Sequence, residues 1–163
     1  MSATSEEVAQ TQGSAYRVLK FGGSSLGSPR NLSAVIDLVE QRRGERPLAV
    51  VVSAMGDATD RLLEAIESAA RGDLDDAEST VDALAEETRE RLVETLPLRG
   101  LEHCDLASLE VTISDWCEQL SRVLEAMSLL GEQTEQSRDL VLSFGERMSA
   151  TVVANLLAAE GME

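Results

Sequence analysis

The chain has 163 residues and carries 30 acidic against 14 basic side chains, a formal net charge of −16. This length is enough for one domain with a hydrophobic core. The acidic excess argues against nucleic-acid or anionic-membrane partners, because binding either needs a basic face. Residues 1–15 are polar and lack the basic and apolar regions of a signal peptide, so we expect a disordered leader on a cytoplasmic protein.

The first predicted strand, Tyr16–Phe21, contains the only lysine of the chain, Lys20, and ends at a glycine-rich turn. The turn reads Gly22, Gly23, Ser24, Ser25. Adjacent glycines let backbone N–H groups approach an anion closely, and an ammonium adds a compact charge suited to phosphate oxygens. The segment alone fits two interpretations equally, a phosphate-binding turn or an ordinary flexible turn beside a surface lysine.

A helix and a second strand follow. Ser28 and Pro29 are typical of a helix start, and apolar residues then recur at helical spacing. They are Leu32, Val35, Ile36 and Val39. Leu48–Val52 is apolar throughout, which predicts a strand buried on both faces of a parallel sheet. Strand, helix and strand at this spacing predict an α/β fold.

Small and polar residues also follow the second strand. They are Ser53, Ala54, Met55, Gly56, Asp57 and Thr59. Because ligands of open α/β sheets bind beyond the carboxyl ends of the strands, we expect this second turn to converge with the glycine-rich turn and form a site.

The rest of the chain is predicted to be helical. The expected helices are 59–70, 73–96, 106–130 and 137–159. The third has an apolar seam with alternating steps of three and four, and the last places Leu140, Val141 and Phe144 on one side. Inside the last helix, Gly145 costs about 1 kcal/mol relative to Ala, which suggests close approach by a ligand or by backbone.

Two residues beside this glycine carry charge. Glu146 is either a binding carboxylate or a solvated side chain. Arg147 is either a local partner of Glu146 or an ordinary helix residue, and we favour the latter interpretation. Elsewhere, His103, Cys104 and Cys117 are too few and unsuitably spaced for a zinc site, so no metal site is predicted.

Three segments together resemble aspartate kinases of the amino-acid kinase family. Residues 18–26, VLKFGGSSL, resemble the KFGGTSV motif; residues 51–60, VVSAMGDATD, resemble VVSAMGxTTD; and residues 143–150, SFGERMSA, resemble SxGERLSA. Their order and spacing match, including a long helical insertion between the second and third. The departures are mild: Ser24 stands where threonine is usual, and Ala58 replaces a frequent threonine.

The resemblance implies transfer of the γ-phosphoryl group of ATP to the β-carboxylate of L-aspartate, the first step toward lysine, threonine and methionine. It makes Lys20 the catalytic cation and the turn Gly22–Ser25 the phosphate site. It assigns Ser53 and Thr59 to substrate aspartate, and Glu146 to its α-ammonium group.

The family's kinase domain is longer than this chain. The resemblance therefore implies that residues 16–163 are the N-terminal part of a parallel-sheet amino-acid kinase fold, truncated before the half that binds most of ATP and Mg²⁺. We expect this part alone to be inactive, and the full-length protein to be a homo-oligomer. Residues 127–131, MSLLG, are similar to a segment of aspartate kinases fused to homoserine dehydrogenase, so both subtypes remain open.

Three alternatives differ in kind. Acetylglutamate, glutamate-5, carbamate and uridylate kinases share the lysine and glycine turn, but generally lack its pairing with a Gly-Glu-Arg helix. A non-catalytic regulatory module on the same scaffold would be free to lose Lys20, Ser53, Thr59 and Glu146. Walker-type NTPases and Rossmann dehydrogenases are disfavoured because their glycine motifs are missing.

Overall fold

The computed structural model describes residues 16–44, 47–101 and 106–162. The predicted leader, residues 1–15, lies outside the described residues, as do His103 and Cys104.

The two predicted strands form a small parallel sheet. β1 (Arg17–Phe21) pairs with β2 (Leu48–Val52), with Phe21 opposite Val52. The first strand starts one residue later than predicted. Because paired parallel strands end at the same edge, the turns that follow β1 and β2 begin side by side.

Helix α1 (Pro29–Arg42) crosses from one strand to the other. It starts where the sequence predicts, because Ser28 Oγ accepts a hydrogen bond of 3.3 Å from the Asn31 N–H and Pro29 takes the first helical position. The strand–helix–strand unit of the α/β prediction is therefore confirmed.

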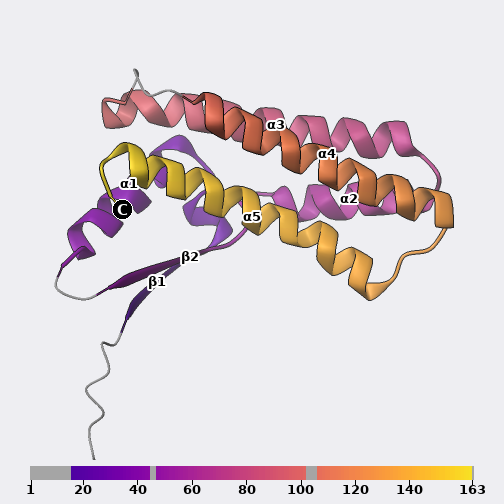
Figure 1. The fold of residues 1–163 in the computed structure, drawn as a ribbon, viewed down its shortest axis with the longest axis horizontal. Coiled ribbons are helices and arrows are strands. Elements are labelled where there is room, and N and C mark those ends of the chain that lie inside the picture. Colours follow the sequence, from indigo (N-terminus) through magenta and orange to yellow (C-terminus); the bar gives the residue numbers. More distant parts are fainter. Residues whose placement is uncertain (1–15, 45–46, 102–105, 163) are drawn as a thin grey trace, which may run out of the picture.

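Further helices follow in the described part of the chain. They are α2 (Ala58–Ala70), α3 (Leu74–Thr95), α4 (Ala107–Leu130) and α5 (Glu135–Ala159), with the short 3-10 helices η1 (Gly23–Ser25) and η2 (Leu96–Arg99). In Figure 1, α3 and α4 lie on the side of α2 and α5 that faces away from the sheet, while α5 runs beside β2. The sheet and α1 occupy one end of this elongated molecule.

Helix α5 begins two residues before its predicted start at Ser137. Thr134 caps the helix through a hydrogen bond of 3.1 Å from the Ser137 N–H to its Oγ1, and the Ser137 side chain bonds back to the Thr134 N–H. Ser137 is thus the third residue of the helix and closes a capping box with Thr134.

The sequence prediction for one side of α5 is partly wrong. Val141 and Phe144 are buried, but Leu140 is 45% exposed, since a helix turns about 100° between neighbouring residues. By length and hydropathy alone α5 could cross a membrane. Here its buried apolar side chains pack instead in the core against α2 and α4, and, near its end, in the core beneath α1.

Two hydrophobic cores meet at the second turn. One lies among α2, α3, α4 and α5 and includes Ala54; the other lies between α1, the sheet and the ends of α3, α4 and α5, and includes Met55. Both residues are almost fully buried, at 4% and 5% exposed. Neighbouring residues of this turn are therefore anchored in separate cores, which fixes the turn relative to both.

The expectation that β2 is buried on both faces is wrong within the described residues. Phe21, Val50 and Val52 pack against the core under α1 and α5, whereas Val18 is 61% and Val51 47% exposed on the opposite face. The reason is that these helices cover only one face of the sheet. Strand alternation places Lys20, which is paired with Val51, on the open face.

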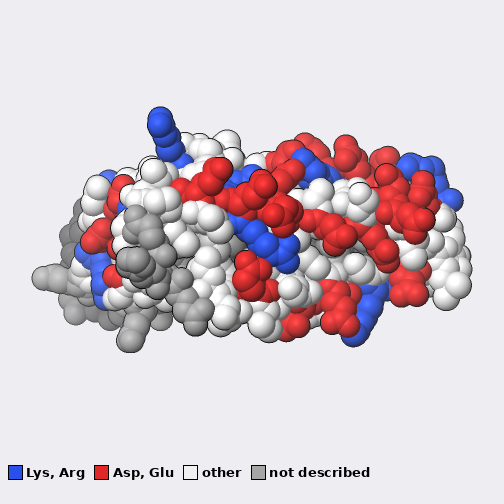
Figure 2. Space-filling view, turned by 90° about the horizontal axis from the view of Figure 1, so that it is seen from above, with Lys and Arg blue, Asp and Glu red and all other residues white. Residues whose placement is uncertain are grey.

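Acidic side chains dominate the face of the helical layer seen from above in Figure 2. Exposed carboxylates on α3 include Asp75, Asp82, Glu86, Glu90 and Glu94. Among them, Arg89 of α3 is bound to Glu110 of α4 at 2.8 Å, which links the two helices across the surface.

Candidate functional site

The first and second turns are hydrogen-bonded to each other. The Ser53 N–H donates to the Phe21 carbonyl at 3.1 Å, which extends the ladder by one bond, and the Gly56 N–H donates to the Gly23 carbonyl at 3.2 Å. The predicted convergence of the two turns at the strand ends is therefore confirmed.

Ala54 fits between two glycines that have no room for a side chain. A Cβ on Gly23 would lie 2.6 Å from the Ala54 carbonyl oxygen, and a Cβ on Gly145 would lie 2.8 Å from the Ala54 Cβ. The Gly145 position is further crowded by Leu62 Cδ1, at 3.3 Å. The close approach predicted at Gly145 is confirmed, and the approaching group is the second turn. Gly23, Ala54 and Gly145, which we call the Ala54 junction, thus bring all three motifs together.

The first turn presents unused hydrogen-bond donors beside a cation. The N–H groups of Ser25 and Leu26 are engaged within the turn, each at 3.0 Å from a glycine carbonyl. Within the described residues, the N–H groups of the preceding range, 22–24, donate to no acceptor. Lys20 is exposed, and its Nζ would lie 3.7 Å from a Cβ on Gly22. Consecutive free N–H groups next to an ammonium suit an anion such as a phosphate.

The other predicted site residues lie close to the Ala54 junction in the chain. Ser53 directly precedes Ala54 and is partly exposed; Thr59 is the exposed second residue of α2; Glu146 follows Gly145 and is exposed. In the described part of the chain, their side chains make no hydrogen bond or ion pair. They are therefore free for a ligand, although their roles stay predictions.

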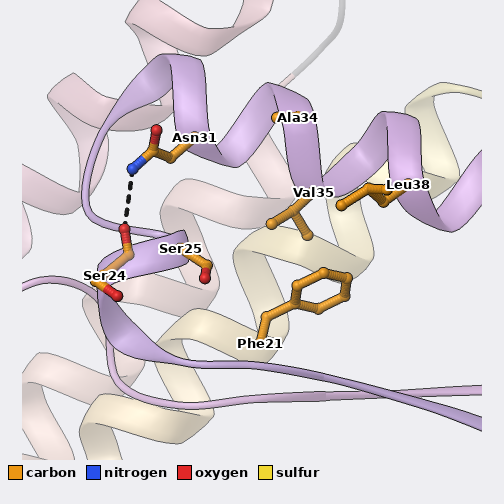
Figure 3. A pocket seen from close by; sticks show the side chains of 7 residues that line it. All are labelled: Phe21, Ser24, Ser25, Asn31, Ala34, Val35 and Leu38. Atoms are coloured by element: carbon orange, nitrogen blue, oxygen red, sulfur yellow. Dashed lines mark hydrogen bonds between the residues drawn. The ribbon is translucent and has the colours of Figure 1, made fainter.

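A pocket of about 460 Å³ opens beside the first turn, between β1 and α1. Figure 3 shows the polar side chains of Ser24, Ser25 and Asn31 at one end and the apolar side chains of Phe21 and Leu38 at the other. Since Ser24 and Ser25 belong to both, the pocket is continuous with the predicted phosphate turn.

The geometry agrees with a comparison of the sequence with known families. The profile of the Amino acid kinase family matches residues 15–163. This chain belongs to the amino acid kinase family. The two-stranded parallel sheet and its helices are the part of that α/β fold contained in these residues.

The amino acid kinase chain is also similar to curated plant proteins. It is 34% identical over 140 residues to "Aspartokinase 2, chloroplastic" of Arabidopsis thaliana, covering 86% of this chain and 24% of that protein. It is 31% identical over 146 residues to "Aspartokinase 1, chloroplastic" of the same plant, with 90% and 24% covered. A "Bifunctional aspartokinase/homoserine dehydrogenase, chloroplastic" of Daucus carota is 31% identical over 156 residues, with 96% and 16% covered. The chain thus spans a quarter or less of the length of these relatives.

Two residues that sequence reasoning missed support the turns of this amino acid kinase site. Asn31 Nδ2 donates to the Ser24 carbonyl at 2.9 Å, and Arg91 of α3 donates to Met55 Sδ at 3.8 Å. The contact of Asn31 could have been predicted from the sequence. Asn31 stands three residues after the helix cap Ser28, where its side chain faces the end of the first turn. No signal in the sequence marks Arg91, because its contact joins segments 36 residues apart.

The interpretation of Arg147 as an ordinary helix residue is wrong. Its guanidinium carbon lies 4.8 Å from the ring centre of Trp116 and 4.7 Å from that of Phe144. A cation stacked on two rings holds α5 against α4. Among the ion pairs of the described residues, none joins Arg147 to the neighbouring Glu146.

Proposed function

We propose that this chain supplies the aspartate-binding and phosphoryl-binding part of an aspartate kinase. The reaction transfers the γ-phosphoryl group of ATP to the β-carboxylate of L-aspartate and produces 4-phospho-L-aspartate, which leads to lysine, threonine and methionine. The observation that carries the proposal is the Ala54 junction, because it places all three aspartate-kinase-like motifs at one point. The similarity to aspartokinases at about 30% identity supports the same substrate.

The chemistry joins two anions, so charge neutralisation and positioning dominate it. A β-carboxylate oxygen forms a bond to the γ-phosphorus while the bond from that phosphorus to the β–γ bridging oxygen breaks and ADP leaves. Lys20 stabilises the negative charge on the transferring group, and the free N–H groups of the first turn donate to its oxygens. No general base is required, because the aspartate carboxylate is already ionised at neutral pH.

The remaining site residues recognise the amino acid. The hydroxyl groups of Ser53 and Thr59 hold substrate aspartate. Thr59 lies in the first turn of α2, where the positive end of the helix dipole also favours a carboxylate. Glu146 pairs with the α-ammonium group. A carboxylate in a site for anions is explained in this way, since aspartate is the one reactant that carries a positive charge.

Mg²⁺, the usual partner of ATP, finds no ligand set in this part of the chain. The described residues hold no group of three carboxylate, histidine or cysteine side chains that could bind a metal ion. We therefore assign no Mg²⁺ ligand and derive no step through the ion. Because the chain spans a quarter or less of its aspartokinase relatives, we also propose that it has little kinase activity alone.

The test measures aspartyl hydroxamate, which forms when hydroxylamine reacts with the acyl phosphate. The assay uses the gene product, a protein that contains this chain and has the length of its aspartokinase relatives. Lys20→Ala should lower kcat by about 10²- to 10³-fold, the usual effect of removing one charge-stabilising donor. Arg30→Ala is the matched control, since it removes another exposed cation from the next helix and should stay within about twofold of wild type.

Three results contradict the proposal in different ways. Turnover of glutamate, N-acetylglutamate or carbamate in place of aspartate keeps the family but changes the substrate. Equal activity of wild type and Lys20→Ala removes the phosphoryl role of the lysine. No turnover of any of these substrates by a folded protein would favour the non-catalytic module.

A further inference from the structure

Asn31 connects the start of α1 to the predicted phosphate turn. Its backbone N–H is bonded to Ser28 Oγ within the helix cap, and its side-chain Nδ2 donates to the Ser24 carbonyl at 2.9 Å. Figure 3 shows the amide pointing from α1 directly at this carbonyl, at the polar end of the pocket. One exposed side chain thus bridges two elements that are otherwise joined by a short loop.

The Ser24 carbonyl is the weakly held end of the turn. The carbonyl of Gly22 accepts from Ser25 at 3.0 Å, and that of Gly23 accepts from both Leu26 and Gly56. Within the described residues, the Ser24 carbonyl receives only a long contact of 3.5 Å from the Gly27 N–H besides the Asn31 amide. Without Asn31, therefore, the Ser24 carbonyl would keep only this long contact, and the peptide group that follows Ser24 would be held by the Ser25 N–H alone, at 3.0 Å from the Gly22 carbonyl oxygen.

The orientation of this peptide group matters for an anion. The free N–H groups of residues 22–24 share their peptide groups with the Phe21, Gly22 and Gly23 carbonyls, and each of these carbonyls accepts a hydrogen bond within the protein. Rotation of the Ser24–Ser25 peptide group would break the bond from the Ser25 N–H to the Gly22 carbonyl and release the peptide group between Gly22 and Gly23. Rotation between two glycines costs little, and it would replace the Gly23 N–H with a carbonyl oxygen, which repels anions. A fixed Ser24 carbonyl therefore preserves an array of donors.

We propose that Asn31 is a positioning residue for the phosphoryl group: it holds the Ser24 carbonyl against α1 and so keeps the N–H groups of the first turn ordered for the anion. The proposal rests on the proposed function for the identity of that anion as the phosphoryl group of ATP. Asn31 acts through the turn and makes no contact with the reacting atoms.

The test compares variants that differ in this one bond. Asn31→Ala removes the amide, and Asn31→Asp keeps the shape but replaces the donor with an acceptor. Asp in the first turn of a helix is favourable for stability, so Asn31→Asp should leave the melting temperature equal to or above that of wild type. Asn155→Ala is the matched control, because Asn155 Nδ2 donates to the Thr151 carbonyl within α5 at the same 2.9 Å.

The first readout needs no enzymatic activity. Amide ¹⁵N relaxation dispersion on the 163-residue chain should show new exchange at Gly22, Gly23 and Ser24 in both Asn31 variants, and none there in Asn155→Ala. Addition of tripolyphosphate should shift these amide signals in wild type. Half-saturation should need about 5- to 10-fold more tripolyphosphate in Asn31→Ala, the loss expected for one net hydrogen bond.

The second readout is kinetic and uses the gene product assayed for aspartyl hydroxamate. Asn31→Ala should reduce kcat/KM for ATP by about 5- to 10-fold and leave KM for aspartate unchanged. A merely structural residue would affect both substrates equally or neither.

The two readouts separate the two proposals. If wild type fails to phosphorylate aspartate, the proposed function is wrong, and the dispersion and tripolyphosphate measurements still decide the role of Asn31. If wild type is active but the Asn31 variants give the same dispersion and tripolyphosphate results as Asn155→Ala, or the same kcat/KM for ATP, the positioning role is wrong. The proposed function then still stands.

Discussion

The Ala54 junction and the helical layer of α3 and α4 hold their parts together by different means. At the junction, turns and α5 approach so closely that two glycine positions have no space for one more carbon atom. The layer uses larger apolar side chains, such as Leu84 and Leu120, and ion pairs at its acidic surface. The junction therefore fixes positions to within a methyl group, while the layer supplies stability that many similar side chains could provide.

Among the variants that test this comparison, Gly23→Ala should lower the stability of the protein most, because it disrupts the Ala54 junction. The added Cβ would meet the Ala54 carbonyl at 2.6 Å and that of Gly56 at 3.4 Å, and backbone cannot move aside cheaply. We expect a loss of about 1–3 kcal/mol in the free energy of unfolding, measured by urea titration. Gly44→Ala is the control, since a Cβ there meets nothing within 4 Å and should be neutral or slightly stabilising. Equal behaviour of the two variants would show that the turns do not pack in this way.

Arg99→Ala tests a third kind of contact, a buried cation that forms ion pairs with two helices. The Arg99 side chain is 8% exposed and binds Asp37 of α1 and Glu160 at the end of α5, the latter at 2.6 Å. Hydrogen bonds to charged groups typically contribute 1.5–3 kcal/mol, so we expect a loss of about 2 kcal/mol in thermal or urea unfolding.

The control for Arg99→Ala is Arg122→Ala, which removes an exposed ion pair with Glu118 on α4 and should cost about 0.5 kcal/mol or less. A loss from Arg122→Ala as large as that from Arg99→Ala would contradict the view that burial distinguishes the two pairs.

The pH dependence of stability that comes from Cys117, in the helical layer, should be the smallest of these effects. Burial raises the pKa of its thiol, Arg89 opposes this, and Asp82 adds to it. The folded state thus favours the neutral thiol. Its contribution to stability is complete below the unfolded pKa of about 8.5 and is lost as pH rises through the higher folded value.

Wild type should consequently lose stability relative to Cys117→Ala as pH rises above about 8.5, in paired urea titrations. In native protein at about pH 8, iodoacetamide should also modify Cys117 more slowly than in urea. A native rate equal to the rate in urea would place the thiol at the surface.

Local patterns predicted much of this structure. Ser28 and Pro29 located the start of α1, and Leu48–Val52 located β2 to the residue, because caps and strand composition act over short distances. The convergence of the two turns followed from the rule that parallel strands end at one edge, and Gly145 was identified by its cost within a helix. These features needed no knowledge of tertiary partners.

The errors occur where a distant partner decides the outcome. The exposure of Val51 depends on which helices cover the sheet, and the stacking of Arg147 depends on Trp116, which lies in another helix. The same holds for Arg91, whose side chain meets Met55 of the second turn, 36 residues away. In each case the residue type allowed several roles, and only the packing selected one.

The most direct test of the Ala54 junction is a double-mutant cycle between Gly145→Ala and Ala54→Gly on the 163-residue chain. Gly145→Ala adds a methyl group 2.8 Å from the Ala54 Cβ, and Ala54→Gly removes the atom that it strikes. Each single variant should lower the free energy of unfolding, and the double variant should be about 1–2 kcal/mol more stable than the sum of the two losses implies. Additivity within about 0.5 kcal/mol would mean that α5 does not meet the second turn at Ala54 and would contradict the junction.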